Sequence, residues 1–270
     1  MEYMSLWNGQ RLPAVALGTY KSQGEELLRA VQAAVDSGYR SFDSAALYDN
    51  EADLCRAIHA SGEPRQELFV TSKVWIDHLE YDAALASFEE SEKKLERIDM
   101  LLIHWPAGEK FLPAWKALER IYEEKRVKAI GVSNFLPHHL ELLAQHAHVK
   151  PMVNQIEAHV FYMDWDTIAR CQTQDVLVEA WSPLGRMRRV AQDPTIAQVA
   201  QAHQKTPAQV ALRYLIQHGL RVLPKSVTPE RIRENIALFD FALSAEEMRQ
   251  LKKLSHPSGR KGDDPNSFGV

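Results

Sequence analysis

Short apolar segments alternate with helical segments along nearly the whole chain, and this alternation limits the possible folds more than any other feature of the sequence. About eight of these segments have the length and composition of buried strands. They span residues 14–17, 41–43, 68–71, 100–103, 127–132, 151–154, 176–180 and 221–224. The expected helices between and after them span residues 25–37, 50–60, 81–96, 112–124, 137–145, 164–173, 194–203 and 207–218, and a further helix begins near residue 228.

Short strands that are buried on both faces and joined by helices pair in parallel, with right-handed crossovers. About eight such units favour a closed (β/α)8 TIM barrel of the α/β class over an open doubly wound sheet. No Gly-x-Gly-x-x-Gly follows the first strand and no Walker-type loop occurs, which argues against the open-sheet alternatives. Because no change in composition marks a linker, we expect residues 1–270 to form a single domain.

Three additions to the barrel are expected at the ends of the chain. The turn Asn8–Gly9 lies between apolar flanks and predicts a hairpin that closes the bottom of the barrel. Ser244, with Glu247 three residues later, predicts a capped helix over residues 244–254. Residues 255–270, which we call the tail, are rich in Gly, Pro and Asp and are expected to form a surface loop.

Charge and composition exclude several classes of partner. A net charge of -4 gives no general attraction to nucleic acid or to anionic membranes. No apolar run is long enough to span a bilayer, and Glu2 near the start argues against a signal peptide. We therefore expect a cytoplasmic monomer in which Cys55 and Cys171, far apart in sequence, are reduced structural thiols.

Polar and reactive residues follow one expected strand after another. Because the carboxyl ends of the strands share one face of such a barrel, these residues are expected to meet there. They are Asp43, Lys73, His104, Ser133, Asn134, Gln155, Glu157, Trp181, Ser182, Lys225 and Ser226.

Four residues suggest proton transfer. Tyr48 lies in the loop after Asp43, and a nearby Lys73 ammonium is expected to lower the pKa of its phenol, while Asp43 holds the ammonium. His104 is placed to hydrogen-bond the same substrate oxygen. Three alternatives remain open: Asp43 and Lys73 form only a buried salt bridge, His104 is a core histidine, or Lys73 is a Schiff-base amine of a lyase.

At this point the sequence resembles the aldo-keto reductase superfamily, in particular its small bacterial members described as 2,5-diketogluconate or methylglyoxal reductases. Residues 38–51 resemble the first signature of that superfamily, residues 102–106 and 129–135 the second, and residues 225–235 the third. The resemblance covers nearly the whole chain from Leu17, and the ending 259–265 adds to it.

The resemblance implies an NADPH-dependent carbonyl reductase with a tetrad of Asp43, Tyr48, Lys73 and His104, in which Tyr48 is the general acid. Ser133, Asn134 and Gln155 would hold the nicotinamide carboxamide, and Trp181 would stack on its ring. Ser182 and Leu184 would border the pyrophosphate. Charged groups of Lys225 and Arg231, with Ser226, would hold the 2′-phosphate and favour NADPH over NADH. Glu234 and Asn235 would lie near the adenine, and Gly18, Thr19 and Tyr20 would line the nicotinamide end beside Asp43.

The expected substrates are small aldehydes or ketones in an open pocket: 2-oxoaldehydes such as methylglyoxal, aromatic aldehydes, or 2,5-diketo-D-gluconate. Its walls would be Tyr20, Tyr48, Trp75, His104 and Trp105, with the alternative that the two tryptophans belong to the core. A further alternative for the whole chain is an NADPH-binding regulatory subunit with little turnover.

A few positions depart from the family pattern or stay open. Ser44 replaces the usual Thr, and His159 lacks the usual following Pro, which leaves the path of that loop open. The loop residues Arg186, Arg188 and Arg189 either contact an anionic ligand or are simply solvated, and Arg231 and Arg233 have the same solvated alternative. Because the spacing of His138, His139, His146 and His148 matches no common site, we expect no metal.

Overall fold

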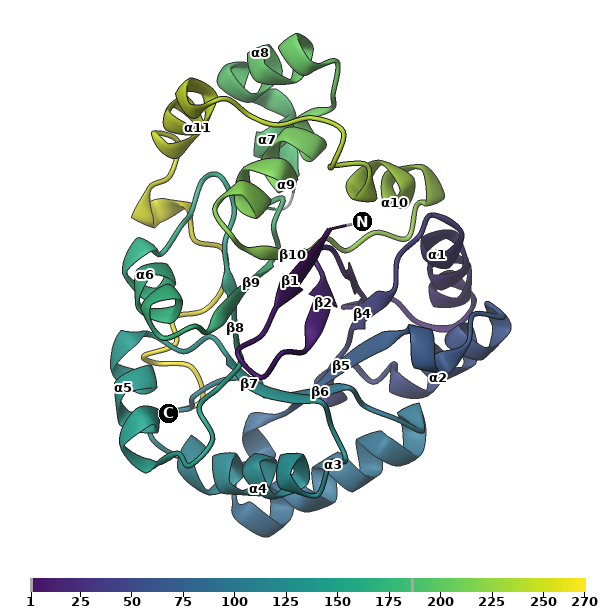
Figure 1. The fold of residues 1–270 in the computed structure, drawn as a ribbon, viewed down its shortest axis with the longest axis vertical. Helices are drawn as coiled ribbons and strands as arrows, with labels where there is room; N and C mark the ends of the chain where they lie inside the picture. The colour runs from purple at the N-terminus through teal and green to yellow at the C-terminus, as the bar shows by residue number, and fades with distance from the viewer. Residues whose placement is uncertain (1, 186) are drawn as a thin grey trace.

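The computed structural model describes residues 2–185 and 187–270 and shows one eight-stranded parallel sheet closed into a barrel (Figure 1). Neighbouring strands follow the order of the chain from β3 to β10. Closure joins the first strand to the last: Val15 bridges Val222 and Gly18 bridges Lys225, both in parallel. The strands are β3 (Leu17–Gly18), β4 (Ser41–Asp43), β5 (Phe69–Val74), β6 (Met100–Ile103), β7 (Ala129–Ser133), β8 (Val153–Glu157), β9 (Leu177–Trp181) and β10 (Arg221–Leu223). The predicted (β/α)8 barrel is confirmed.

Helices form a ring around the strands (Figure 1). The longer helices bury a stripe of apolar side chains against the barrel, as α1 does with Leu27, Val31 and Ala34. The helices are α1 (Gly24–Asp36), α2 (Glu51–Ala60), α3 (Tyr81–Leu95), α4 (Phe111–Glu123), α5 (Pro137–His146), α6 (Trp165–Thr173), α7 (Arg188–Gln192), α8 (Pro194–His203), α9 (Pro207–Gln217), α10 (Pro229–Ile236) and α11 (Ala245–Lys252). Single turns of 3-10 helix lie at Ala46–Tyr48, Arg65–Glu67, Ile76–His78 and Pro257–Gly259. No helix in the described part of the chain is long and apolar enough to span a membrane.

The N-terminal hairpin of β1 (Tyr3–Ser5) and β2 (Arg11–Pro13) covers the amino ends of the barrel strands, as expected. Trp7 Nε1 donates a hydrogen bond to the carbonyl of Pro151, and Asn8 Nδ2 donates to that of Lys128. Both acceptors lie just before a strand begins, which places the hairpin at that end (Figure 1). Gly9 has a φ of 85°, the left-handed conformation that the turn requires.

Two local expectations were wrong. Within residues 14–16, Val15 pairs with the barrel through an isolated bridge to Val222. The first strand is therefore only Leu17–Gly18, shorter than expected. Arg188 and Arg189 begin the short helix α7 instead of lying in a loop, while Arg186 lies outside the described residues.

The tail is not a simple surface loop, because it returns across the carboxyl end of the barrel. The Glu157 carboxylate accepts hydrogen bonds from the backbone N–H groups of Lys261 and Gly262, each at 2.7 Å. Gly259 packs so closely that a Cβ there would lie 1.9 Å from the Phe161 carbonyl oxygen. The tail therefore has a fixed path beside the ends of the strands.

Candidate active site

The carboxyl ends of the strands surround a cavity of about 680 Å³. Most of the side chains predicted from the sequence line it, and they come from all eight strand ends or the loops that follow them. These are Gly18, Tyr20, Asp43, Tyr48, Trp75, His104, Trp105, Ser133, Asn134, Gln155, Trp181, Ser182 and Lys225. The expectation that strand-end residues converge is therefore met by the geometry.

Lys73 lies behind the cavity wall, fully buried, and its ammonium is held by three hydrogen bonds. Nζ donates to both carboxylate oxygens of Asp43, at 2.9 and 2.8 Å, and to the carbonyl of Ser44 at 2.8 Å. Burial lowers the pKa of Lys73, but the Asp43 carboxylate offsets it and the net pKa is raised. Lys73 is thus a charged ammonium, and its Nζ lies 5.1 Å from the centre of the Tyr48 ring.

The pKa of Tyr48 is raised, not lowered as expected from the sequence. Burial raises the pKa most, and the Lys73 ammonium lowers it by less. The sequence could place the ammonium near the phenol, but it could not weigh this against desolvation. Tyr48 is consequently a neutral phenol in this structure, able to give a proton.

His104 faces Tyr48, with ring centres 5.7 Å apart. Burial and then the nearby Lys73 ammonium hold the pKa of His104 well below its usual value, so the imidazole is neutral. Its Nδ1 is buried and has no hydrogen-bond partner among the described residues. A neutral imidazole beside a phenol can donate one hydrogen bond to a substrate oxygen at the same point.

Ser133, Asn134 and Gln155 form a connected polar rim on the neighbouring strands β7 and β8. Ser133 Oγ donates to the Gln155 carbonyl at 2.9 Å, and Asn134 Nδ2 donates to the His104 carbonyl at 3.0 Å. Asn134 has a φ of 64°, and its Oδ1 accepts a 2.8 Å hydrogen bond from Trp181 Nε1. These bonds fix the side chains before any ligand is present.

Aromatic side chains close the other side of the cavity. Trp75 lies 5.0 Å from the His104 ring, and Phe268 of the tail lies 4.3 Å from Trp105. Trp75 and Trp105 therefore line the cavity, although Trp105 is also largely buried. The tail, which the sequence did not place here, forms part of the cavity wall through Gly262, Asp263 and Phe268.

Sequence reasoning missed the cavity residues Lys21, Leu47, Leu223, Gly262, Asp263 and Phe268. The three tail residues were missed because the Gly- and Pro-rich composition indicated a surface loop. The clustered glycines, of which Gly259 and Gly262 leave no room for a Cβ, were the available signal of close packing.

Six predicted cofactor residues lie outside the cavity. Thr19 is buried beneath it and donates to the Asp43 carbonyl at 2.9 Å. Leu184 packs partly against the core. Ser226 caps the turn before α10, where its Oγ accepts from the Thr228 N–H at 3.1 Å. On α10, Arg231 is exposed, Glu234 accepts from Thr206 Oγ1 at 2.5 Å, and Asn235 is buried.

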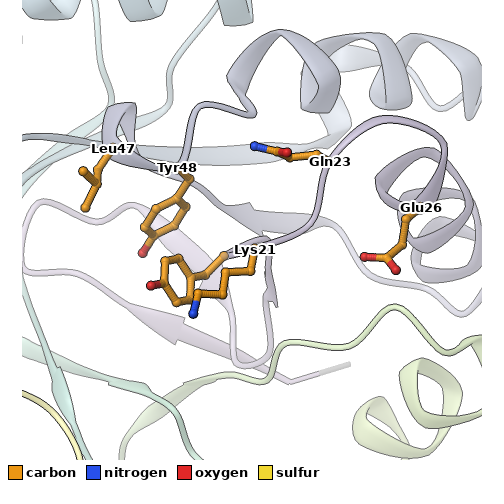
Figure 2. Close-up of a pocket in the computed structure, with 6 residues that line it drawn as sticks. Lys21, Gln23, Glu26, Leu47 and Tyr48 are labelled. Carbon is orange, nitrogen blue, oxygen red and sulfur yellow. The ribbon is translucent and has the colours of Figure 1, made fainter.

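A second, more open cleft of about 500 Å³ adjoins the cavity at Tyr48 (Figure 2). Tyr20, Lys21 and Leu47 line both spaces. Gln23 and Glu26, at the start of α1, form its far side (Figure 2). Tyr20 and Tyr48 stand between the two spaces, with ring centres 5.0 Å apart.

Two groups of metal-ligand residue types lie away from this site. His138 and His139 stack at 3.9 Å, and the Nδ1 of His139 accepts from the Leu136 N–H at the start of α5. Cys55, His59 and Glu96 place their ligand atoms within 4.8 Å of one another at the ends of α2 and α3 that point away from the cavity. His59 and Glu96 already pair at 2.9 Å.

Comparison with known proteins places this chain in one family. Residues 14–256 match the aldo/keto reductase family. A 9,11-endoperoxide prostaglandin H2 reductase of Trypanosoma cruzi is 43% identical over 270 residues, which cover 98% of this chain and 95% of that protein. A glyoxal reductase of Bacillus subtilis is 42% identical, covering 98% and 96% of the two chains. The crystal structure of an aldo-keto reductase from a deep-sea metagenome library superposes with a TM-score of 0.94 at 39% identity, covering 99% of each chain. The chain therefore belongs to the aldo/keto reductase family and is a nicotinamide-dependent oxidoreductase of carbonyl compounds.

Proposed function

We propose that this protein reduces small aldehydes and ketones to alcohols with NADPH, and that Tyr48 is the general acid. The observation that carries the proposal is the pair of Tyr48 and His104 on the cavity wall, with the buried Lys73 directly behind Tyr48. A neutral phenol, a buried ammonium behind it and a neutral imidazole beside it suit the protonation of a carbonyl oxygen. When bound, the nicotinamide supplies the hydride.

Each residue of the tetrad has a distinct task in this proposal. The substrate oxygen lies between the Tyr48 hydroxyl and the His104 imidazole, which orients it by a hydrogen bond. Tyr48 gives its phenolic proton to that oxygen. The Lys73 ammonium, held by Asp43, stabilises the tyrosinate that forms as the proton leaves.

The polar rim fits the nicotinamide carboxamide. Ser133 and Asn134 are fixed by their own hydrogen bonds and still have free acceptor capacity, and the carbonyl oxygen of the Gln155 side chain makes no hydrogen bond among the described residues. Trp181 stands beside them as the surface for the ring. We propose that Gly18, Thr19 and Tyr20 border this end, and that Ser182 and Leu184 border the pyrophosphate.

The preference for NADPH rests on the start of α10. Lys225 and Arg231 are exposed cations near its N-terminus, where a helix also favours anions. With Ser226 they would hold the 2′-phosphate, and Glu234 and Asn235 would lie at the adenine. A Gox0644 variant, 38% identical and with a TM-score of 0.93, was crystallised with NADPH, and 98% of each chain is covered.

For the substrate we propose small 2-oxoaldehydes such as methylglyoxal, aromatic aldehydes, or 2,5-diketo-D-gluconate. The cavity supports this class because aromatic rings of Tyr20, Trp75, Trp105 and Phe268 wall the space beside His104. Relatives named glyoxal reductase and methylglyoxal reductase agree with it. We also propose that the protein acts as a cytoplasmic monomer, which gel filtration and cell fractionation would test.

The lyase alternative is disfavoured by the state of Lys73. A Schiff-base amine must be neutral to attack a carbonyl, whereas Lys73 is a charged ammonium that donates three hydrogen bonds. The regulatory-subunit alternative predicts NADPH binding without turnover, and only kinetics separates it from an enzyme.

The deciding experiment follows NADPH absorbance with methylglyoxal, an aromatic aldehyde and the diketo sugar acid. Wild type is expected to oxidise NADPH, and Tyr48→Phe is expected to lose about 10²–10⁴-fold in kcat while still binding it. Tyr81→Phe, at the half-buried first residue of α3 and outside the cavity, is the matched control and keeps full activity. NADPH binding without turnover in wild type would favour the regulatory subunit, and no binding would refute the cofactor assignment.

A further inference from the structure

The amide of Gln155 has both of its N–H groups committed to carboxylates. Nε2 donates to Asp43 Oδ1 at 2.9 Å and to Glu179 Oε2 at 2.9 Å. A primary amide has two N–H donors and one carbonyl acceptor, so only the carbonyl oxygen of Gln155 remains for a ligand. The reversed amide would place that oxygen against two carboxylates. The orientation of Gln155 therefore depends on its two acidic neighbours.

Glu179 is held in turn by a buried arginine on the next strand. Glu179 and Arg221 are paired in register between β9 and β10, and Arg221 Nη1 donates to Glu179 Oε1. Both side chains are completely buried. Arg221 also donates to the Pro13 carbonyl at 2.7 Å and to Ser41 Oγ at 2.5 Å, so its guanidinium cannot turn away.

A buried ion pair of this kind is weak evidence for stability, because the cost of desolvating both charges offsets their attraction. The contacts of the Glu179 carboxylate indicate a role other than stability. One Glu179 oxygen binds Arg221 and the other binds Gln155, which in turn contacts Asp43 of the tetrad. The pair thus connects the interior of the barrel to the wall of the cavity.

We propose that Glu179, fixed by Arg221, is a positioning residue that orients the Gln155 amide so that its carbonyl oxygen accepts a hydrogen bond from the nicotinamide carboxamide. Glu179 touches no ligand and acts only through Gln155. The proposal rests on the proposed function, because the ligand is the nicotinamide cofactor. The Glu179 charge also raises the pKa of Lys73, which shows that the two sites are electrostatically linked.

Glu179→Gln is the most informative single change. The new amide has one oxygen, and the charged Arg221 attracts it more strongly than Gln155 does. The N–H groups of the new amide then face those of Gln155. Gln155 must therefore either lose one hydrogen-bond acceptor or flip its own amide. We expect NADPH binding, measured by quenching of tryptophan fluorescence, to weaken about tenfold or more.

The double variant Glu179→Gln/Arg221→Met separates positioning from packing. Without Arg221 the new amide oxygen is free to accept from Gln155, so the affinity for NADPH should return to within about threefold of wild type. Its thermal stability should nevertheless fall, because the Pro13 carbonyl loses its donor. Glu119→Ala, which removes a buried acceptor on α4, is the control: it should lower Tm without changing the affinity.

Two results would overturn the proposal. One is a Glu179→Gln protein that binds NADPH as wild type does, and the other is a loss of affinity that persists in the folded double variant. If Glu179→Gln does not fold, Glu179→Asp gives the same comparison, because it keeps the charge beside Arg221 but shortens the reach to Gln155.

A readout in the ligand-free protein separates this inference from the proposed function. Side-chain amide signals of Gln155 in ¹H–¹⁵N NMR spectra should show slow hydrogen exchange in wild type and fast exchange in Glu179→Gln. If wild type does not bind NADPH, the proposed function fails, and these signals still decide whether Glu179 orients Gln155. Unchanged exchange in the variant would refute the orienting role.

Discussion

Phe268, near the end of the chain, lies against Trp105, with ring centres 4.3 Å apart and ring planes inclined by 34°. Trp105 follows His104 at the end of β6, so this contact brings the tail to the strand end that carries the imidazole. Phe268 also lies 5.9 Å from Trp75, which itself lies 5.0 Å from His104. The tail therefore supplies an aromatic wall to the side of the cavity that holds His104.

Removal of this wall should change specificity more than chemistry. We expect Phe268→Ala to lower kcat/KM for an aromatic aldehyde about fivefold, because an aromatic pair contributes about 1 kcal/mol beyond its buried area. The smaller methylglyoxal should lose much less. Steady-state kinetics with both substrates checks this, with Phe241→Ala, in the loop between α10 and α11, as control. Equal losses of kcat/KM for both substrates would contradict the prediction that Phe268 forms a wall that contacts the aromatic substrate.

Gly262 positions the same segment beside Trp181. A Cβ at this position would lie 2.4 Å from Trp181 Cη2 and 3.1 Å from Glu157 Oε2, so Gly262→Ala must displace the tail or the indole. We expect a higher KM for substrate and weaker NADPH binding, with little change in Tm because the tail adds little to the core. Lys261→Ala keeps its backbone hydrogen bond to Glu157 and should behave as wild type. Unchanged kinetics in Gly262→Ala would show that the tail can be displaced without any effect on the cavity.

The sequence predicted the barrel and the strand-end side chains because both follow from simple rules. Asp43 and His104 could be placed on one face once the strands were known to be parallel. The position of Phe268 could not be predicted, since it depends on the path of a tail without regular structure. Glu179 was missed because, within an apolar strand, nothing in the sequence distinguishes a polar residue that faces the barrel interior.

The pH dependence of stability should reveal a buried histidine on α5. Burial lowers the pKa of His139 to about 4. The unfolded chain therefore binds more protons than the folded one between the ordinary value of about 6.5 and about 4, and the free energy of unfolding should fall as the pH drops through this window. His104 and His218, whose pKa values are also lowered by burial, add to the effect.

His139→Gln should make this dependence shallower. A glutamine at this position can still accept from the Leu136 N–H, as in a capping box, but it does not titrate. Urea unfolding of the variant near neutral pH and under mildly acid conditions gives the comparison. The exposed His146→Gln on the same helix should follow wild type, and an unchanged slope in His139→Gln would contradict the assignment.

Selectivity for NADPH should depend on Arg231 more than on Arg233. Arg233 pairs with Glu230 at 3.2 Å, whereas Arg231 forms no salt bridge with the described residues and is free for a phosphate. We expect Arg231→Ala to weaken NADPH binding about tenfold or more and to leave NADH binding unchanged. Arg233→Ala is the matched control. Equal effects of the two variants, or an equal effect on both cofactors, would contradict a 2′-phosphate site at Arg231.

The pair of Lys73 and Asp43 allows a test that separates a structural ion pair from a catalytic one. Lys73→Met leaves the buried Asp43 carboxylate without its cation, which should destabilise the fold by about 3–5 kcal/mol and lower Tm. The double variant Lys73→Met/Asp43→Asn removes both charges and should recover most of that loss, since the neutral amide that replaces the carboxylate needs no ammonium partner.

Activity should not recover with stability, because the tyrosinate that forms at Tyr48 still lacks its ammonium. We expect kcat of the double variant to remain about 10²–10⁴-fold below wild type. Urea unfolding and NADPH oxidation, measured on the same preparations, give the two quantities side by side. A double variant that regained both would mean that Lys73 and Asp43 only hold the barrel together, and that the proton given to the substrate does not depend on the charge behind Tyr48.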